Sequence, residues 1–136
     1  LEVFEMLQTR NIKLNARLSS THRSVEMFLA GLSEHLEYPW TLESMARHCN
    51  LGRSRFSHYC RQITNMTAAD YLIHCRIERA KKMLSESNGK TILDIAMACG
   101  FESSQYFATC FKKKTGTTPT QYRTDVLSGK QQRNVL

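Results

Sequence analysis

The stretch "TILDIAMACGFESSQYFATCFKKKTG", from Thr91 to Gly116, predicts two short helices joined by a tight turn. Apolar residues at helical spacing precede Gly100, and a second apolar set, which includes Phe107 and Phe111, follows it after a polar segment. Thr91 is a favourable helix cap, and Gly100 favours the left-handed conformation in which many helices end. A short helix, a turn of about four residues and a second short helix form a helix-turn-helix.

The same pattern occurs a second time, fifty positions earlier in the chain. The residues that correspond in the two copies are Thr41, Leu42, Met45, Ala46 and Cys49 in the first and Thr91, Ile92, Ile95, Ala96 and Cys99 in the second. After the turn the offset becomes fifty-one, so that Phe56 corresponds to Phe107. Asn50 and Asn65 stand where the second copy has glycine, and asparagine tolerates positive φ better than most residues. We interpret the pattern as an internal duplication.

The rest of the chain extends this pattern to an all-α fold of about seven helices. Residues 21–66 are predicted to form the first helix-turn-helix unit, which begins with an amphipathic helix that ends near Pro39, and residues 90–124 the second. Residues 67–89 are expected to hold one linker helix, roughly 30 Å long. Residues 1–20 suit a connector or dimer helix from an upstream domain and equally a frayed linker, and the polar residues 125–136 are expected to be a disordered tail.

Charge and cysteine content limit the functional classes. The 136 residues carry 19 Lys and Arg against 12 Asp and Glu, a net charge of +7 with a pI near 9.4, so nucleic acid is the first candidate partner and an anionic membrane surface the second. No apolar run approaches the roughly 20 residues of a membrane span, no signal peptide is visible, and no membrane partner is expected. The five cysteines are odd in number and form no CxxC, which predicts neither a disulfide framework nor a metal site, and no cofactor is expected. Reduced core cysteines indicate a cytoplasmic compartment.

The outer faces of the second helix in each unit combine short polar side chains with cations. Polar groups near the start of such a helix can contact base edges in a major groove, while cations near its end can meet phosphates. The candidate base-proximal residues are Ser54, Arg55, Ser57 and His58 in the first unit and Ser104, Gln105, Tyr106 and Thr109 in the second; the candidate phosphate contacts are Arg53, Arg61, Lys112 and Lys113. A solvated surface would explain either helix alone, but two equivalent helices in duplicated units favour DNA binding. For Tyr106, stacking on a sugar and simple packing stay equal alternatives.

The segment "TILDIAMACGFESSQYFATCFKKKTGTTPTQYR" resembles the second helix-turn-helix of the AraC/XylS family of bacterial transcription regulators. "TLESMARHCNLGRSRFSHYC" and "YLIHCRIERAKKMLSES" are similar to the first unit and the linker helix of that family, so the resemblance covers roughly residues 21–124. Gly52, Cys60 and Ala68 depart from the family pattern in the first unit. The resemblance implies a two-unit domain that binds double-stranded promoter DNA and recruits RNA polymerase, most often for activation. It also implies a separate sensing or dimerising domain, so a homodimer formed there or through residues upstream of 20 is one expectation.

The combined prediction is a non-enzymatic, sequence-specific DNA-binding domain on the bacterial nucleoid that places two recognition helices in successive major grooves. Two alternatives remain. A thiol-dependent DNA-repair or DNA-modifying protein that shares this domain would need an activated cysteine, whereas each cysteine here falls on a predicted inner helix face. An architectural protein that binds DNA without sequence preference would need only cations, and polar groove-facing residues such as Gln105 disfavour it.

Overall fold

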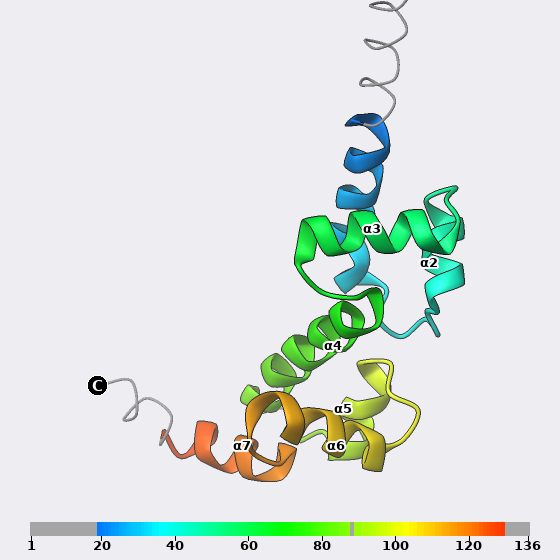
Figure 1. Cartoon of the computed structure of the whole chain (residues 1–136). Helices are drawn as coiled ribbons and strands as arrows, with labels where there is room; N and C mark the ends of the chain where they lie inside the picture. Colours follow the sequence, from blue (N-terminus) through cyan, green and yellow to red (C-terminus); the bar gives the residue numbers. More distant parts are fainter. Residues whose placement is uncertain (1–18, 88, 130–136) are drawn as a thin grey trace, which may run out of the picture. The chain divides into compact units, whose positions relative to one another are not determined.

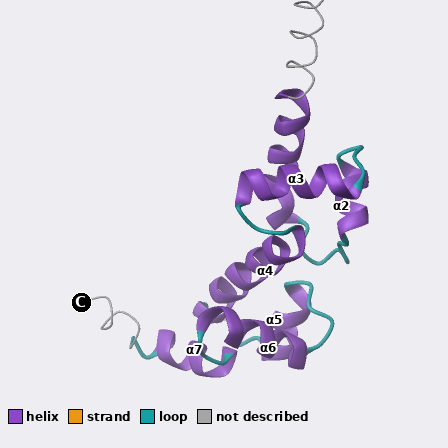
Figure 2. Ribbon diagram, viewed as in Figure 1, coloured by secondary structure: helices purple, strands orange, loops and turns teal. Residues whose placement is uncertain are grey.

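The computed structural model describes residues 19–87 and 89–129, and all regular structure in these ranges is helical (Figures 1 and 2). A first helix has its described part over residues 19–31 and is followed by the 3-10 helix η1. The elements in chain order after the first helix are η1 (Leu32–Glu34), α2 (Leu42–His48), α3 (Arg53–Thr64), α4 (Ala68–Ser85), α5 (Ile92–Ala98), α6 (Ser104–Thr115) and α7 (Pro119–Leu127). The predicted all-α fold with about seven helices is confirmed. The connector expected over residues 1–20 lies almost wholly outside the described residues.

The chain divides into two compact units, each formed by two separate segments of the sequence. Unit 1 comprises Leu1–Gly31 and Thr41–Ala68, and unit 2 comprises Leu32–Trp40 and Ala69–Leu136. Two boundaries therefore differ from those expected. Residues 32–40, expected in the first helix-turn-helix unit, belong to unit 2, and so does nearly all of the linker helix α4.

The helix expected to end near Pro39 ends earlier. Its α-helical part stops at residue 31. Leu32, in η1, and Leu36, in the loop after η1, are both fully buried. At the other end of the chain, α7 runs through Leu127, so residues 125–127, which were expected in a disordered tail, form the last turn of a helix. Residues 130–136 lie outside the described part of the chain.

The duplication predicted from the sequence is visible in the helices and their caps. α2 and α5 both have 7 residues, and α3 and α6 both have 12. Thr41 and Thr91 each form a capping box with the residue three positions later. The turn after the first helix of each pair contains a residue of positive φ, Asn50 at 57° and Gly100 at 93°.

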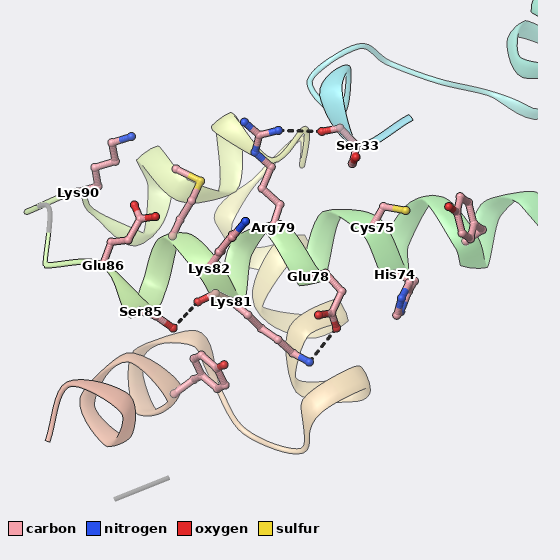
Figure 3. A pocket seen from close by; sticks show the side chains of 13 residues that line it. Ser33, His74, Cys75, Glu78, Arg79, Lys81, Lys82, Ser85, Glu86 and Lys90 are labelled. Carbon is pink, nitrogen blue, oxygen red and sulfur yellow. Dashed lines mark hydrogen bonds and ion pairs between the residues drawn. The ribbon is translucent and has the colours of Figure 1, made fainter. Parts of the chain in front are cut away.

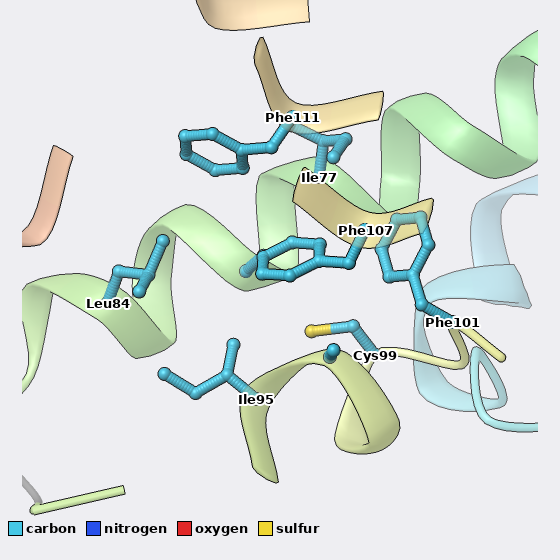
Figure 4. Packing of buried hydrophobic residues seen from close by; sticks show 9 residues of the cluster. Ile77, Leu84, Ile95, Cys99, Phe101, Phe107 and Phe111 are labelled. Carbon is cyan, nitrogen blue, oxygen red and sulfur yellow. The ribbon is translucent and has the colours of Figure 1, made fainter. Parts of the chain in front are cut away.

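The core of unit 2 joins the linker helix to the helix-turn-helix. Figure 4 shows the Phe107 ring of α6 between side chains of α4 and α5. The ring centroid of Phe107 lies 5.0 Å from that of Phe101 and 5.6 Å from that of Phe111. Ala96 is fully buried, as its equivalent Ala46 nearly is in unit 1, and the small side chain lets two helices approach closely.

Candidate nucleic-acid interface

The recognition-helix candidate of unit 2, α6, has one buried face and one polar face. Phe107 and Phe111 are fully buried, whereas Gln105, Thr109 and Lys112 are exposed. The Thr109 hydroxyl donates a hydrogen bond of 3.1 Å to the carbonyl oxygen of Gln105 and keeps its lone pairs for an outside donor. The side-chain amide of Gln105 therefore lies on a solvent-facing surface with both donor and acceptor groups at its end.

Tyr106 and Ser104 border this face differently from Gln105. Tyr106 is 51% exposed, its ring meets that of Phe101 edge-on at 6.1 Å, and a hydrogen bond with Cys110 raises the pKa of its phenol. It therefore packs against Phe101 on one side and offers the other side to solvent. Ser104 is half-buried at the edge of the face.

The end of α6 carries consecutive lysines. Lys112 and Lys113 are exposed in the last turn, where the helix dipole favours positive charge. Across residues 19–87 and 89–129, neither lysine forms an ion pair with a carboxylate. Both ammonium groups are thus available to an external anion.

In unit 1, α3 presents an equivalent face. Phe56, Tyr59 and Cys60 are buried on the inner side. The predicted contact residues Ser54, Arg55, His58 and Arg61 are exposed, and Ser57 is half-buried. The structure therefore brings the predicted residues of each unit together on one helix face.

Two features distinguish α3 from α6. Gly52, the N-cap of α3, makes no side-chain hydrogen bond, whereas the Ser103 hydroxyl at the equivalent position of α6 accepts one of 3.1 Å from the Tyr106 amide. Arg53 also lies 3.4 Å from the Glu43 carboxylate, an exposed ion pair that competes with the phosphate contact predicted for this arginine. Glu43 is not among the residues predicted from the sequence.

A buried charged residue that the sequence-based prediction missed is Arg76 of α4. Only 8% of it is exposed, and its guanidinium hydrogen-bonds backbone carbonyl groups of residues 36 and 38. Its position between the buried Leu72 and Ala80, four residues away on either side, was the available signal, because a charge in an apolar stripe requires buried partners.

An open groove of about 1070 Å³ lies along α4 in unit 2 (Figure 3). Two of its cations already have partners: the Lys81 ammonium lies 2.9 Å from the Glu78 carboxylate, and Arg79 donates a 2.8 Å hydrogen bond to the Ser33 carbonyl. The acidic residues Glu78 and Glu86 line the groove together with basic side chains. The groove therefore lacks the uniform positive charge of the exposed C-terminal end of α6. Among the described residues, no cluster of three His, Cys, Asp or Glu side chains could hold a metal ion, and no helix is long and apolar enough to cross a membrane.

All five cysteines are free thiols. Cys60 and Cys99 are buried, and the other three are half-buried. Burial raises the pKa of Cys49, Cys60 and Cys75, and it raises the pKa of Cys99 to about 11. This is opposite to the shift that activates a nucleophilic cysteine.

Known proteins are similar to this chain in sequence. A family model described as a helix-turn-helix domain matches residues 45–125. The HTH-type transcriptional activator RhaR of Cronobacter sakazakii is 34% identical over 100 residues, which are 74% of this chain and 35% of RhaR. The bifunctional transcriptional activator/DNA repair enzyme AdaA of Bacillus subtilis is 34% identical over 99 residues, which are 73% of this chain and 46% of AdaA.

Among solved structures, the DNA-binding domain of the global transcriptional factor AdpA, in complex with a target DNA, is similar with a TM-score of 0.74. It is 25% identical, and the match covers 79% of this chain and 96% of that chain. The present chain spans less than half the length of the two curated relatives described above. With the family model matched over more than half of its residues and both helix-turn-helix units in place, the chain belongs to the AraC/XylS family of helix-turn-helix transcription regulators.

Proposed function

We propose that this domain binds double-stranded promoter DNA with sequence specificity, with α3 and α6 each entering a major groove. The observation that carries the proposal is the repeated scheme of α3 and α6: helices of equal length, each with a fully buried aromatic residue on one face and exposed polar and cationic side chains on the other. AdpA, whose domain is similar, was solved with its target DNA, which supports the same ligand for this chain.

The proposed roles follow from the position of each side chain on its helix. Residues of the first two turns contact base edges, and these are Ser54, Arg55, Ser57, His58, Ser104, Gln105, Tyr106 and Thr109. Arg61, Lys112 and Lys113 near the helix ends contact phosphates, and Arg53 does so once its ion pair with Glu43 opens. The two sets of base-reading residues differ, so the two half-sites differ in sequence.

The regulatory outcome is proposed to be activation, with RNA polymerase as the downstream partner. RhaR and AdaA are both named transcriptional activators, and the present chain corresponds to about a third to a half of their length. Signal sensing and dimer formation are proposed to reside in the remaining part of such a protein.

The salt dependence of binding tests the phosphate contacts. If four to eight cations meet phosphates, log K against log salt falls with a slope of roughly −4 to −7. Lys112→Ala should weaken binding to all DNA sequences equally and flatten the slope by about one unit. Lys82→Ala is the matched control, because Lys82 is exposed on α4 outside both recognition faces and its removal changes the net charge equally. A slope near zero for the wild type would remove DNA as the partner.

Selection of binding sites from random DNA tests the base contacts. Gln105 can form two hydrogen bonds with an adenine edge, worth about 1–3 kcal/mol against a wrong base. Gln105→Ala should relax preference at one or two base pairs and leave the salt slope intact, whereas Gln121→Ala on α7 should change neither. An unchanged selection profile in Gln105→Ala would contradict the assignment, and no preference in the wild type would favour an architectural protein.

A thiol-dependent repair activity is the rival that AdaA, named as a bifunctional DNA repair enzyme, brings into consideration. The raised pKa values of four of the five thiols support a non-enzymatic domain, because a nucleophilic cysteine requires a stabilised thiolate. Thiol titration of the native protein distinguishes the two, since one fast-reacting cysteine would revive the enzymatic alternative.

A further inference from the structure

The side chain of Arg76 fastens a distant segment of unit 2 to α4. Its Nε donates a 3.1 Å hydrogen bond to the Leu36 carbonyl, and its Nη2 donates bonds of 3.0 Å to Leu36 and 2.9 Å to the Tyr38 carbonyl. The guanidinium is buried, and burial lowers the pKa of Arg76, so these carbonyl groups supply the polar partners that a buried cation requires.

The turn between α5 and α6 packs directly against this pair of elements. Gly100 has φ of 93°, and a Cβ added to it would overlap the Leu36 carbonyl oxygen and lie 2.8 Å from Arg76 Nε. Only glycine therefore fits between the loop and the guanidinium. We call Arg76, Gly100 and the carbonyl groups of Leu36 and Tyr38 the Arg76 clamp.

Unit 1 has the same turn without the clamp. Asn50 occupies the position equivalent to Gly100 with φ of 57°, and its side chain is exposed. The backbone conformation of the turn thus needs no clamp, because asparagine achieves it in unit 1. The clamp is therefore not what permits the positive φ in unit 2.

From the clamp, a short path leads to the exposed face of α6. Phe101, next to Gly100, is buried, and its amide donates a 2.9 Å hydrogen bond to the Ala96 carbonyl. Its ring contacts both Phe107 in the core, at 5.0 Å, and Tyr106 on the half-exposed edge, at 6.1 Å. The hydrogen bond with Cys110 is the main cause that raises the pKa of the Tyr106 phenol, and the positive charge of Arg76 acts in the opposite direction.

We propose that Arg76 is a positioning residue for DNA recognition by unit 2: through the clamp it fixes the turn that aims the first two turns of α6 at the bases. The proposal rests on the proposed function of α6. It predicts that loosening the clamp changes which bases unit 2 selects, while the phosphate contacts at the other end of α6 persist.

The test compares the charge-conserving variant Arg76→Lys with Gly100→Asn. Lysine keeps the net charge but cannot reproduce the two-pronged donor geometry of arginine. Asparagine at 100 keeps a residue that tolerates positive φ, as at Asn50, but its Cβ enters the clamp. Arg79→Lys and Asn50→Gly are the matched controls, because Arg79 donates to Ser33 on the surface of the same unit and Asn50 lies in the turn without a clamp.

Three measurements are made on each variant. Trp40, the only tryptophan, belongs to the 32–40 segment and donates a 2.8 Å hydrogen bond to the His35 carbonyl, so its fluorescence reports whether that segment and unit 2 stay folded. Selection from random DNA gives the base preference of each half-site, and a salt titration gives the number of phosphate contacts.

We expect both clamp variants to lose on the order of tenfold in base discrimination at the half-site read by α6. The other half-site, the salt slope and both controls should stay at wild-type values. If folded Arg76→Lys and Gly100→Asn keep the wild-type selection profile, the positioning role is overturned. Should one variant unfold, the other decides, and if the wild type selects no sequence at all, the proposed function fails rather than the clamp.

Discussion

The substitution Gly52→Ser tests whether unequal caps make the two recognition helices unequal in stability. Gly52 has extended φ and ψ of −74° and 167°, which serine adopts without strain. No atom lies within 4 Å of the position that its Cβ would take. The hydroxyl could then accept a hydrogen bond from the Arg55 amide, as Ser103 does from Tyr106 at 3.1 Å in α6.

The expected magnitudes follow from measured cap preferences. Serine exceeds glycine as an N-cap by only a few tenths of a kcal/mol, and alanine is worse than serine by about 1 kcal/mol. Gly52→Ser should therefore raise the free energy of local unfolding of α3 by about 0.3 kcal/mol, and Gly52→Ala should lower it by about 0.7 kcal/mol. The gap of about 1 kcal/mol isolates the hydrogen bond, because both variants add a Cβ and restrict the unfolded chain similarly.

Native-state hydrogen exchange is the suitable assay because the two units need not unfold together. A gap of about 1 kcal/mol corresponds to roughly a fivefold difference in protection of the α3 amides. The α6 amides serve as an internal control in both Gly52 variants, and Ser103→Ala should shift the effect to α6. Equal protection of α3 in Gly52→Ser and Gly52→Ala would refute the reasoning, since no cap would then have formed.

Three further predictions concern the linker, the core and the thiols. The linker helix α4 is one continuous helix of 18 residues, about 27 Å long. Inserting 5 bp between the half-sites should therefore reduce the affinity for DNA, measured by fluorescence anisotropy, to that of a single unit. Unchanged affinity would mean that the linker bends or that one unit alone binds. Phe107→Ala should destabilise unit 2 by about 3–5 kcal/mol in urea titrations followed by Trp40 fluorescence, because the ring is fully buried, and a loss below about 1 kcal/mol would contradict its central position. The pKa of Cys99, raised from 9.0 to about 11, should slow its alkylation at pH 8 about 100-fold relative to the urea-unfolded chain, as measured by mass spectrometry; equal rates would refute the burial argument. The same shift favours the folded state below pH 9, and this contribution should fade as the pH rises toward about 11.

The features predicted well from the sequence are those determined by neighbours along the chain. Threonine caps, residues of positive φ and apolar residues at helical spacing act within a few positions. They predicted both helix-turn-helix units and the correspondence of Asn50 and Asn65 to glycines, and these asparagines do adopt positive φ. The exposed faces of α3 and α6 follow from the same periodicity once Phe56 and Phe107 are buried.

The segment 32–40 groups with unit 2 rather than with the first helix-turn-helix because its partners lie about forty residues away. Leu32 and Leu36 continue the apolar spacing of the first helix and are buried as that spacing predicts, but the helix has already ended. An α-helix that ended at residue 39 would leave the carbonyl groups of its last four residues without helical partners. Here Arg76 donates to two carbonyl groups in that stretch, an interaction 40 positions distant for Leu36.

Such a partner leaves no pattern in the sequence, because every residue has a backbone carbonyl group. Arg76 would have been recognisable only as a charge among buried neighbours in α4, with no carboxylate at helical spacing to pair with it. The correspondence of Asn50 and Gly100 in the repeat gave no sign of this interaction, because both residues adopt positive φ. In the structure Gly100 is packed against Leu36 and Arg76, whereas the Asn50 side chain is exposed. The two copies therefore share a backbone plan but differ in what surrounds it. Among residues 19–87 and 89–129, a buried cation lies beside the turn that precedes the recognition helix in unit 2 and not in unit 1.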